Sequence, residues 1–211
     1  MTSLVIAFVV VLLVPLFVAN WRTSLFGLAL QGVLLYAIAA RIEGPERSIE
    51  SVVTFVDLIV VRALIAPGVL YRVLHSRSAR ERVVLPPNML AWTAAIGLVI
   101  LAFRVSSALV PADGDDRTLV GAVASAVFLG FLVLASRVGV FSQVMGALRI
   151  ENAVALFELS NGPHAGSVGI HIAETALAVT SIGLFGWYLA RMAPSPVDSV
   201  EVEDEFQETL P

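Results

Sequence analysis

The sequence predicts an all-α, polytopic membrane protein with about seven transmembrane helices. Hydrophobic residues make up 58% and charged residues 14% of the chain, whereas globular domains average about 45–50% and about 25%. Several apolar runs approach the roughly 20 residues that a helix needs to cross about 30 Å of hydrocarbon. These runs lack the alternating pattern of barrel strands, so helices are the expected spanning elements.

Pro, Gly and charge clusters separate the apolar runs. The first run has no basic segment and no small-residue cleavage site, so we interpret it as a spanning helix and not as a signal peptide. The sixth run is the least apolar because it carries several charges. The expected helices lie near residues 2–19, 23–41, 52–73, 89–110, 118–136, 139–160 and 167–191.

The arginine distribution predicts the orientation. The loop at 71–87 is the most basic segment and is expected to be cytoplasmic. Seven alternating helices then place the N-terminus outside and the C-terminus in the cytoplasm. Arg22 and Arg137 fall in cytoplasmic loops, as the rule requires, whereas Arg41 and Arg47 fall on the outer side.

The chain divides into three parts. Residues 1–110 form a four-helix N-terminal extension, residues 118–191 a three-helix membrane domain, and residues 192–211 an acidic cytoplasmic tail. The tail is Pro-rich and then acidic, which is typical of a solvated, disordered segment. The alternative is a strap that becomes ordered against a neighbouring subunit.

Several classes of site are excluded by composition. The chain has no cysteine, so it holds no disulfide, cysteine-ligated iron–sulfur cluster or thiolate zinc site. It has no nucleotide-binding glycine motif and no HExxH or CxxCH sequence, and its three histidines are scattered. We therefore expect no catalytic centre, metal site or cofactor in this chain, and no basic face for nucleic acid.

The segment "RIENAVALFELS" places charges within an expected span. Glu151 lies about twelve residues into its helix, or ~18 Å from the cytoplasmic end, near mid-membrane. An ionisable group at that depth costs about 2.5–3.5 kcal/mol, so it is usually paired, hydrated or functional. We expect Glu151 to handle protons, with a structural ion pair as the alternative. Glu158 lies two turns on and near the outer boundary; for it, hydration is preferred and proton transfer is the alternative.

The last expected helix carries a second acidic candidate. Glu174 lies ~10 Å inside the outer boundary, and His171 precedes it at i,i+3 on the same face. A carboxyl and an imidazole on one face can pass a proton. For His171 a hydrogen-bonded structural role is preferred, and proton relay is the alternative. Glutamate suits proton transfer because burial and a nearby arginine act on its protonation in opposite directions.

Four further charges are candidates for mid-membrane or near-interface partners: Asp57, Arg62, Arg104 and Arg149. Asp57 and Arg62 are five residues apart, about 140° around an α-helix, so they are not expected to pair simply within it. Partners on other helices or other chains are expected. For each arginine, interhelical pairing or snorkelling to the interface is the preferred interpretation.

Two stretches carry a resemblance to a known family. "RVGVFSQVMGALRIENAVALFELS" followed by "GIHIAETALAVTSIGLFGWYLA" resembles the last two helices of the small K-type (NuoK-like) subunit of respiratory complex I. That family has one glutamate in the second and one in the third of its three helices; the matching positions here are Glu151 and Glu174. K-type helices place an Asn several residues after the first glutamate, whereas Asn152 follows Glu151 directly.

The whole chain, with its four additional helices, resembles the E-type (HyfE-like) membrane subunit of hydrogenase 4 and formate-hydrogenlyase-type complexes. The string "IENAVALFELS" is the most specific match. The resemblance implies a non-redox subunit of an energy-converting, complex-I-like assembly in a bacterial or archaeal plasma membrane. It also implies antiporter-like and heel membrane subunits as partners, with peripheral [NiFe] and iron–sulfur subunits carrying the electrons.

Two other functions remain open. The chain can be a structural scaffold that fills the interface between antiporter-like subunits, with its charges in fixed pairs. It can also belong to a multisubunit cation/proton antiporter, although K-like proteins of those complexes have about three helices. A self-contained transporter or enzyme is disfavoured because no inverted repeat, broken helix or catalytic cluster is visible.

Overall fold

The computed structural model describes residues 1–17, 20–43, 49–75, 89–110, 114–136, 139–160 and 168–192. Seven helical rods occupy these parts of the chain, as the apolar runs predict. The third rod is continuous and consists of α3 (Ile49–Phe55), η1 (Val56–Ile65) and α4 (Ala66–His75). The other six are α1 (Thr2–Phe17), α2 (Trp21–Glu43), α5 (Met89–Leu109), α6 (Asp115–Ser136), α7 (Val140–Ser160) and α8 (Val168–Met192). The acidic tail from residue 193 onward lies outside the described residues.

Five rods are long and apolar enough to cross a membrane: α2, the 49–75 rod, α5, α6 and α8. The described apolar part of α1 is shorter, at Thr2–Leu13. The helix α7 is not among the five because its polar residues lower its mean hydropathy. The described chain thus has the composition of a multi-pass membrane protein.

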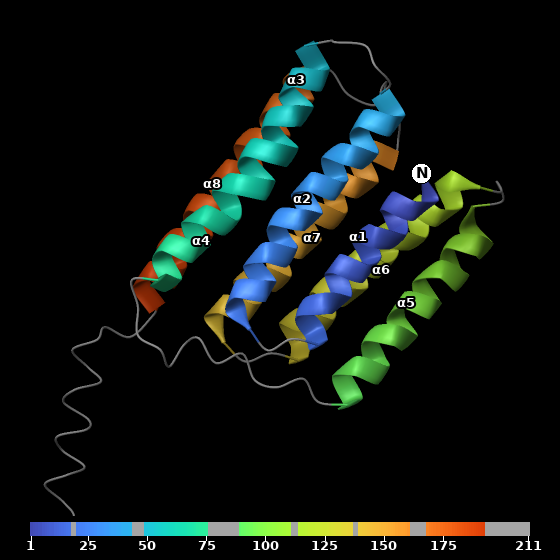
Figure 1. The fold of residues 1–211 in the computed structure, drawn as a ribbon, viewed down its shortest axis with the longest axis horizontal. Helices are drawn as coiled ribbons and strands as arrows, with labels where there is room; N and C mark the ends of the chain where they lie inside the picture. Colours follow the sequence, from blue (N-terminus) through green and yellow to red (C-terminus); the bar gives the residue numbers. More distant parts are fainter. Residues whose placement is uncertain are drawn as a thin grey trace, which may run out of the picture.

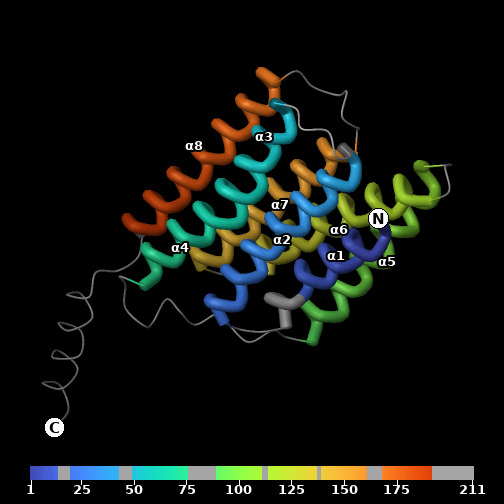
Figure 2. Tube along the Cα trace, turned by 45° about the horizontal axis from the view of Figure 1, so that its top comes forward, coloured from blue at the N-terminus to red at the C-terminus, as the bar shows by residue number. Residues whose placement is uncertain are grey.

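The rods form two layers (Figure 1). One layer consists of α1, α2 and the 49–75 rod; the other consists of α6, α7 and α8, each behind the corresponding helix of the first layer. The helix α5 packs on the outer side of α6, at one edge of the bundle (Figure 2). Thr2 Oγ1 donates a 2.7 Å hydrogen bond to Asp115 Oδ1, so α1 and α6 begin at the same end.

Two apolar clusters hold the layers together. The larger lies between α1, α2, α6 and α7, and the smaller lies between α2, the 49–75 rod, α7 and α8. Fully buried side chains at their centres are Phe8, Leu12, Leu35, Leu129 and Leu156 in the first and Leu28 and Leu70 in the second.

Glycines allow close approach at two helix contacts. A Cβ added to Gly130 or to Gly146 would lie 3.3 or 3.2 Å from the other's carbonyl oxygen, so α6 and α7 nearly touch there. A Cβ on Gly32 would lie 2.8 Å from the Leu58 carbonyl oxygen and the Ala63 Cβ, so η1 lies even closer to α2. Small residues at such positions increase van der Waals contact, the main source of helix association in membranes.

The middle of the 49–75 rod is a π-helix of ten residues, where the apolar run predicts regular α-helix. In a π-helix each N–H bonds to the carbonyl five residues back, and here Ala66 N–H bonds to the Val61 carbonyl. Pro67 follows at once. In a regular α-helix its ring would clash with the Ala63 carbonyl, four residues before it. The wider turn before the proline avoids this clash.

Candidate functional site

An ion pair lies within the π-helical segment. Arg62 Nε donates a 2.9 Å hydrogen bond to Asp57 Oδ2, and the two side chains are only 9% and 14% exposed. The expectation that these residues do not pair within their helix is therefore wrong. It assumed α-helical geometry, whereas the i→i+5 bonding of η1 brings residues five apart above one another.

Two further hydrogen bonds extend the ion pair across two other helices. Arg62 Nη1 donates to Asn152 Oδ1 of α7 at 3.3 Å, and Asn152 Nδ2 donates to Gln31 Oε1 of α2 at 3.2 Å. All three residues are buried. The interhelical partner expected for Arg62 is thus a neutral amide, and Asn152 links the guanidinium to Gln31.

Glu151 lies next to this chain of hydrogen bonds, on the side of α8. Its partly buried carboxyl is hydrogen-bonded to the Ser181 hydroxyl of α8 and interacts electrostatically with Arg62 and Asp57. Glu151, Ser181 and Arg62 all lie near the middle of their rods. The carboxyl therefore lies at the junction of η1, α7 and α8, about halfway along the bundle.

A second group of ionisable residues lies nearer one end of α7 and α8. His171 Nδ1 and Glu174 Oε2 are 3.3 Å apart, as their i,i+3 spacing predicts, with side chains 33% and 28% exposed. Glu158 of α7 is partly buried and interacts electrostatically with both. Glu158 is thus the α7 carboxyl that interacts with Glu174, and it lies near the end of α7, two turns beyond the mid-bundle Glu151.

The remaining two arginines have different surroundings. Arg149 is 2% exposed and lies one turn before Asn152 on the buried face of α7. Arg104 is exposed on α5, at the edge of the bundle and away from η1, α7 and α8 (Figure 1). Of the four charge partners expected from the sequence, Asp57 and Arg62 lie beside Glu151, whereas Arg104 does not.

Sequence reasoning missed two polar residues that the structure brings to this junction, Gln31 and Ser181. Each is a polar residue near the middle of an apolar run, which is the signal that could have indicated them. We call the whole set the polar junction. It consists of Gln31, Asp57, Arg62, Glu151, Asn152, Glu158, His171, Glu174 and Ser181.

The polar junction has the kinds of side chain that proton transfer needs. Within the described ranges, no group of three or more His, Asp or Glu side chains is arranged to hold a metal ion. Its carboxyls, imidazole and hydroxyl can each accept and donate a proton.

Comparison of the chain with protein-family models, with curated proteins and with solved structures finds no match.

Proposed function

We propose that this chain is a non-redox membrane subunit of an energy-converting hydrogenase-type, complex-I-like assembly, and that it carries protons through the polar junction. In this proposal all seven rods span a bacterial or archaeal plasma membrane, with the N-terminus outside and the C-terminus in the cytoplasm. The observation that supports it most is the position of Glu151. This carboxyl lies halfway along the bundle, where three helices meet, beside a buried ion pair.

The energetic argument starts from the depth of the charges. Each ionisable group at the centre of a spanning helix costs about 2.5–3.5 kcal/mol. Asp57, Arg62 and Glu151 all lie well inside their rods and interact with one another. Packing alone does not need them, because the close contact between α6 and α7 is formed by apolar and small residues.

The arrangement gives each charged residue a role. Arg62 is paired with Asp57, whereas Glu151 is hydrogen-bonded to the neutral hydroxyl of Ser181. A shift of the guanidinium from Asp57 toward Glu151 would favour the ionised form of Glu151, and the reverse shift would favour its protonated form. A proton released from Glu151 would pass toward the end of the bundle where Glu174 and Glu158 lie.

The exposure of α8 supports a partner on that side. Most of its face is exposed, and the carboxyl of Glu174 and the ring of His171 are about one-third exposed. Charged groups inside a membrane face protein or water and not lipid. An antiporter-like or heel subunit packed against α8 would cover them and continue the proton path.

The test replaces the carboxyls in the intact assembly, purified through this chain and reconstituted in vesicles. Glu151→Gln and Glu174→Gln should each leave electron transfer working and lower proton translocation by about a hundredfold, the lower end of what a positioned proton-transfer group contributes. Asp116→Asn, which removes an exposed carboxyl at the start of α6, is the matched control. Full coupled translocation in both glutamine variants would reject the proposal.

One observation favours the alternative of a structural scaffold. Gln31, Asn152, Arg62 and Asp57 form a continuous buried network that resembles a fixed interhelical clamp. If the chain is a scaffold, the glutamine variants should lose the assembly and not its coupling. The subunits that co-purify separate the remaining alternative. Co-purification with a nickel-bearing subunit supports the hydrogenase assembly. Co-purification with an active cation/proton antiporter that lacks such a subunit supports the antiporter alternative.

A further inference from the structure

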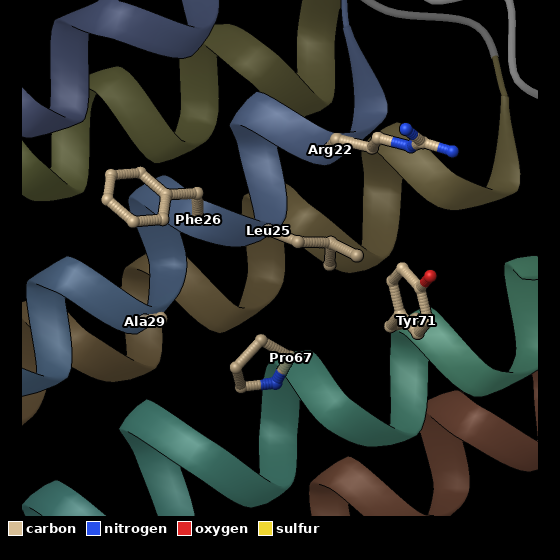
Figure 3. Close-up of a pocket in the computed structure, with 6 residues that line it drawn as sticks. All are labelled: Arg22, Leu25, Phe26, Ala29, Pro67 and Tyr71. Atoms are coloured by element: carbon tan, nitrogen blue, oxygen red, sulfur yellow. The ribbon is translucent and has the colours of Figure 1, made fainter.

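A groove between α2 and α4 is separate from the polar junction. It has a volume of about 370 Å³, within the range of small-molecule sites. Figure 3 shows Arg22 and Tyr71 toward one end of the groove, with Phe26, Ala29 and Pro67 toward the other. The groove is thus polar at one end and apolar along the rest of its length.

The polar end of the groove lies at the end of the bundle where several helix termini carry basic residues. The helix α2 begins there and has no acidic residue in its first turn, and α4 ends there with Arg72 and His75 in its last turn. The helix α8 ends on the same side of the bundle with Arg191 (Figure 1). In the described terminal turns of α2, α4 and α8 at this end, the charged residues are basic.

Aromatic rings at the polar end of the groove indicate its depth in a membrane. The Arg22 guanidinium lies 5.4 Å from the centre of the Trp21 ring, and Trp21 lies 5.6 Å from Tyr71. Tyr71 stacks on His75 at 5.4 Å. Trp and Tyr gather at the headgroup level of membranes, where one side of the ring is apolar and the other wet. The mouth of the groove therefore lies at the headgroup level and its apolar part at the level of the acyl chains.

We propose that this groove binds one anionic phospholipid. The Arg22 guanidinium and the Tyr71 hydroxyl hold the headgroup phosphate, and one acyl chain lies along Leu25, Phe26 and Pro67. Basic pockets between spanning helices recognise anionic headgroups in this way. Phe26 is 69% exposed and forms an apolar wall, while the small side chain of Ala29 leaves the space open.

Charge complementarity favours this occupant over a helix of a partner protein. An apolar helix placed in the groove would cover Arg22 without supplying an anion, and burying an unpaired guanidinium is unfavourable. A phospholipid supplies both a negative group at the basic end and an apolar chain beyond it. The site needs only a membrane, so it stands independently of the proton-transfer proposal.

The headgroup contact is tested by native mass spectrometry of the full chain, released from detergent with phosphatidylglycerol or phosphatidylcholine of identical acyl chains. The wild type should prefer phosphatidylglycerol. Arg22→Gln should reduce that preference about fivefold, as expected for losing about 1 kcal/mol from one arginine near an anionic headgroup. Arg104→Gln, which removes an exposed arginine on α5, should leave the preference unchanged.

The groove itself is tested by two variants that keep Arg22. Ala29→Trp fills the groove and should weaken binding of both lipids, and Phe26→Ala removes an exposed wall and should weaken it less. Ala29→Trp can disturb folding as well as fill the groove. Phe26 is exposed, so Phe26→Ala should leave folding unchanged and tests the groove in that case. Equal binding of the two lipids by the wild type, equal effects of Arg22→Gln and Arg104→Gln, or unchanged binding in Phe26→Ala would each overturn the proposal.

Discussion

The helix contacts on the two sides of the bundle, α5 with α6 and η1 with α2 and α7, differ in how their buried polar side chains are hydrogen-bonded. Where α5 packs on α6, the buried hydroxyls bond to their own helices: Ser106 to the Phe103 carbonyl and Ser125 to the Gly121 carbonyl. Where η1 meets α2 and α7, buried side chains bond across helices, from Arg62 through Asn152 to Gln31. The α5–α6 contact therefore shows what packing requires, and the polar junction contains more than packing requires.

The difference has a physical meaning in a membrane. Lipid tails are as apolar as leucine, so helices associate through close van der Waals contact and small residues, as at Gly121 beneath Phe103. Buried charge is unfavourable unless it is paired or used. Its concentration on one side is the basis for our proposal that this side carries the function.

The largest expected effect comes from breaking the ion pair. Arg62→Leu leaves the Asp57 carboxylate buried without its partner, which typically costs about 3–5 kcal/mol. The free energy of unfolding, measured by reversible detergent titration of the full chain, should fall by that amount. The matched change in the other region, Arg104→Leu, should alter it by no more than about 0.5 kcal/mol.

The double variant Asp57→Leu with Arg62→Leu sharpens this result. Replacing a whole buried ion pair by apolar residues is often neutral, so most of the lost stability should return. If Arg62→Leu proves as mild as Arg104→Leu, the pair is not buried in the way described, and the contrast between the two sides fails.

A smaller effect is expected at the glycine that brings η1 to α2. Gly32→Ala places a Cβ 2.8 Å from the Leu58 carbonyl, so the two helices must separate, at a typical cost of about 1–3 kcal/mol. Gly97→Ala on α5 meets nothing within 4 Å and should stabilise its helix by up to about 1 kcal/mol. Unfolding midpoints that move in the same direction in both variants would contradict the close contact of η1 with α2.

The smallest effect is the coupling across helices. A double-mutant cycle with Gln31→Ala and Asn152→Ala should give a coupling of about 0.6 kcal/mol, the average for interhelical hydrogen bonds in a membrane protein. The same cycle with Ser106→Ala and Ser125→Ala should give none, because each hydroxyl bonds within its own helix. Equal coupling in the two cycles would remove the distinction between the two sides.

Much of the fold follows from the apolar pattern, because spanning length and apolarity are local properties of the chain. The predicted runs and the observed rods differ at their ends by three residues or fewer, as in 52–73 against 49–75. Orientation relative to a membrane and the division at the 111–117 loop stay predictions. So do the roles of Glu151, Glu158, His171 and Glu174.

The details of the site were less accessible to sequence reasoning. The pairing of Asp57 with Arg62 depends on the π-helical turn, which a 3.6-residue period does not represent; Pro67 was the local signal for an irregular helix. The link from Gln31 to Asn152 joins residues 121 positions apart, so no spacing rule could predict it. Register between helices depends on small residues such as Gly32, whose partners only the folded chain brings together.

The most direct test of the central claim is the number of protons translocated per electron pair by the purified assembly carrying Glu151→Gln, beside the same ratio for Asp116→Asn. The account predicts that the first ratio falls close to zero while electron transfer continues, and that the second equals the wild-type ratio. A wild-type ratio in both variants would contradict it.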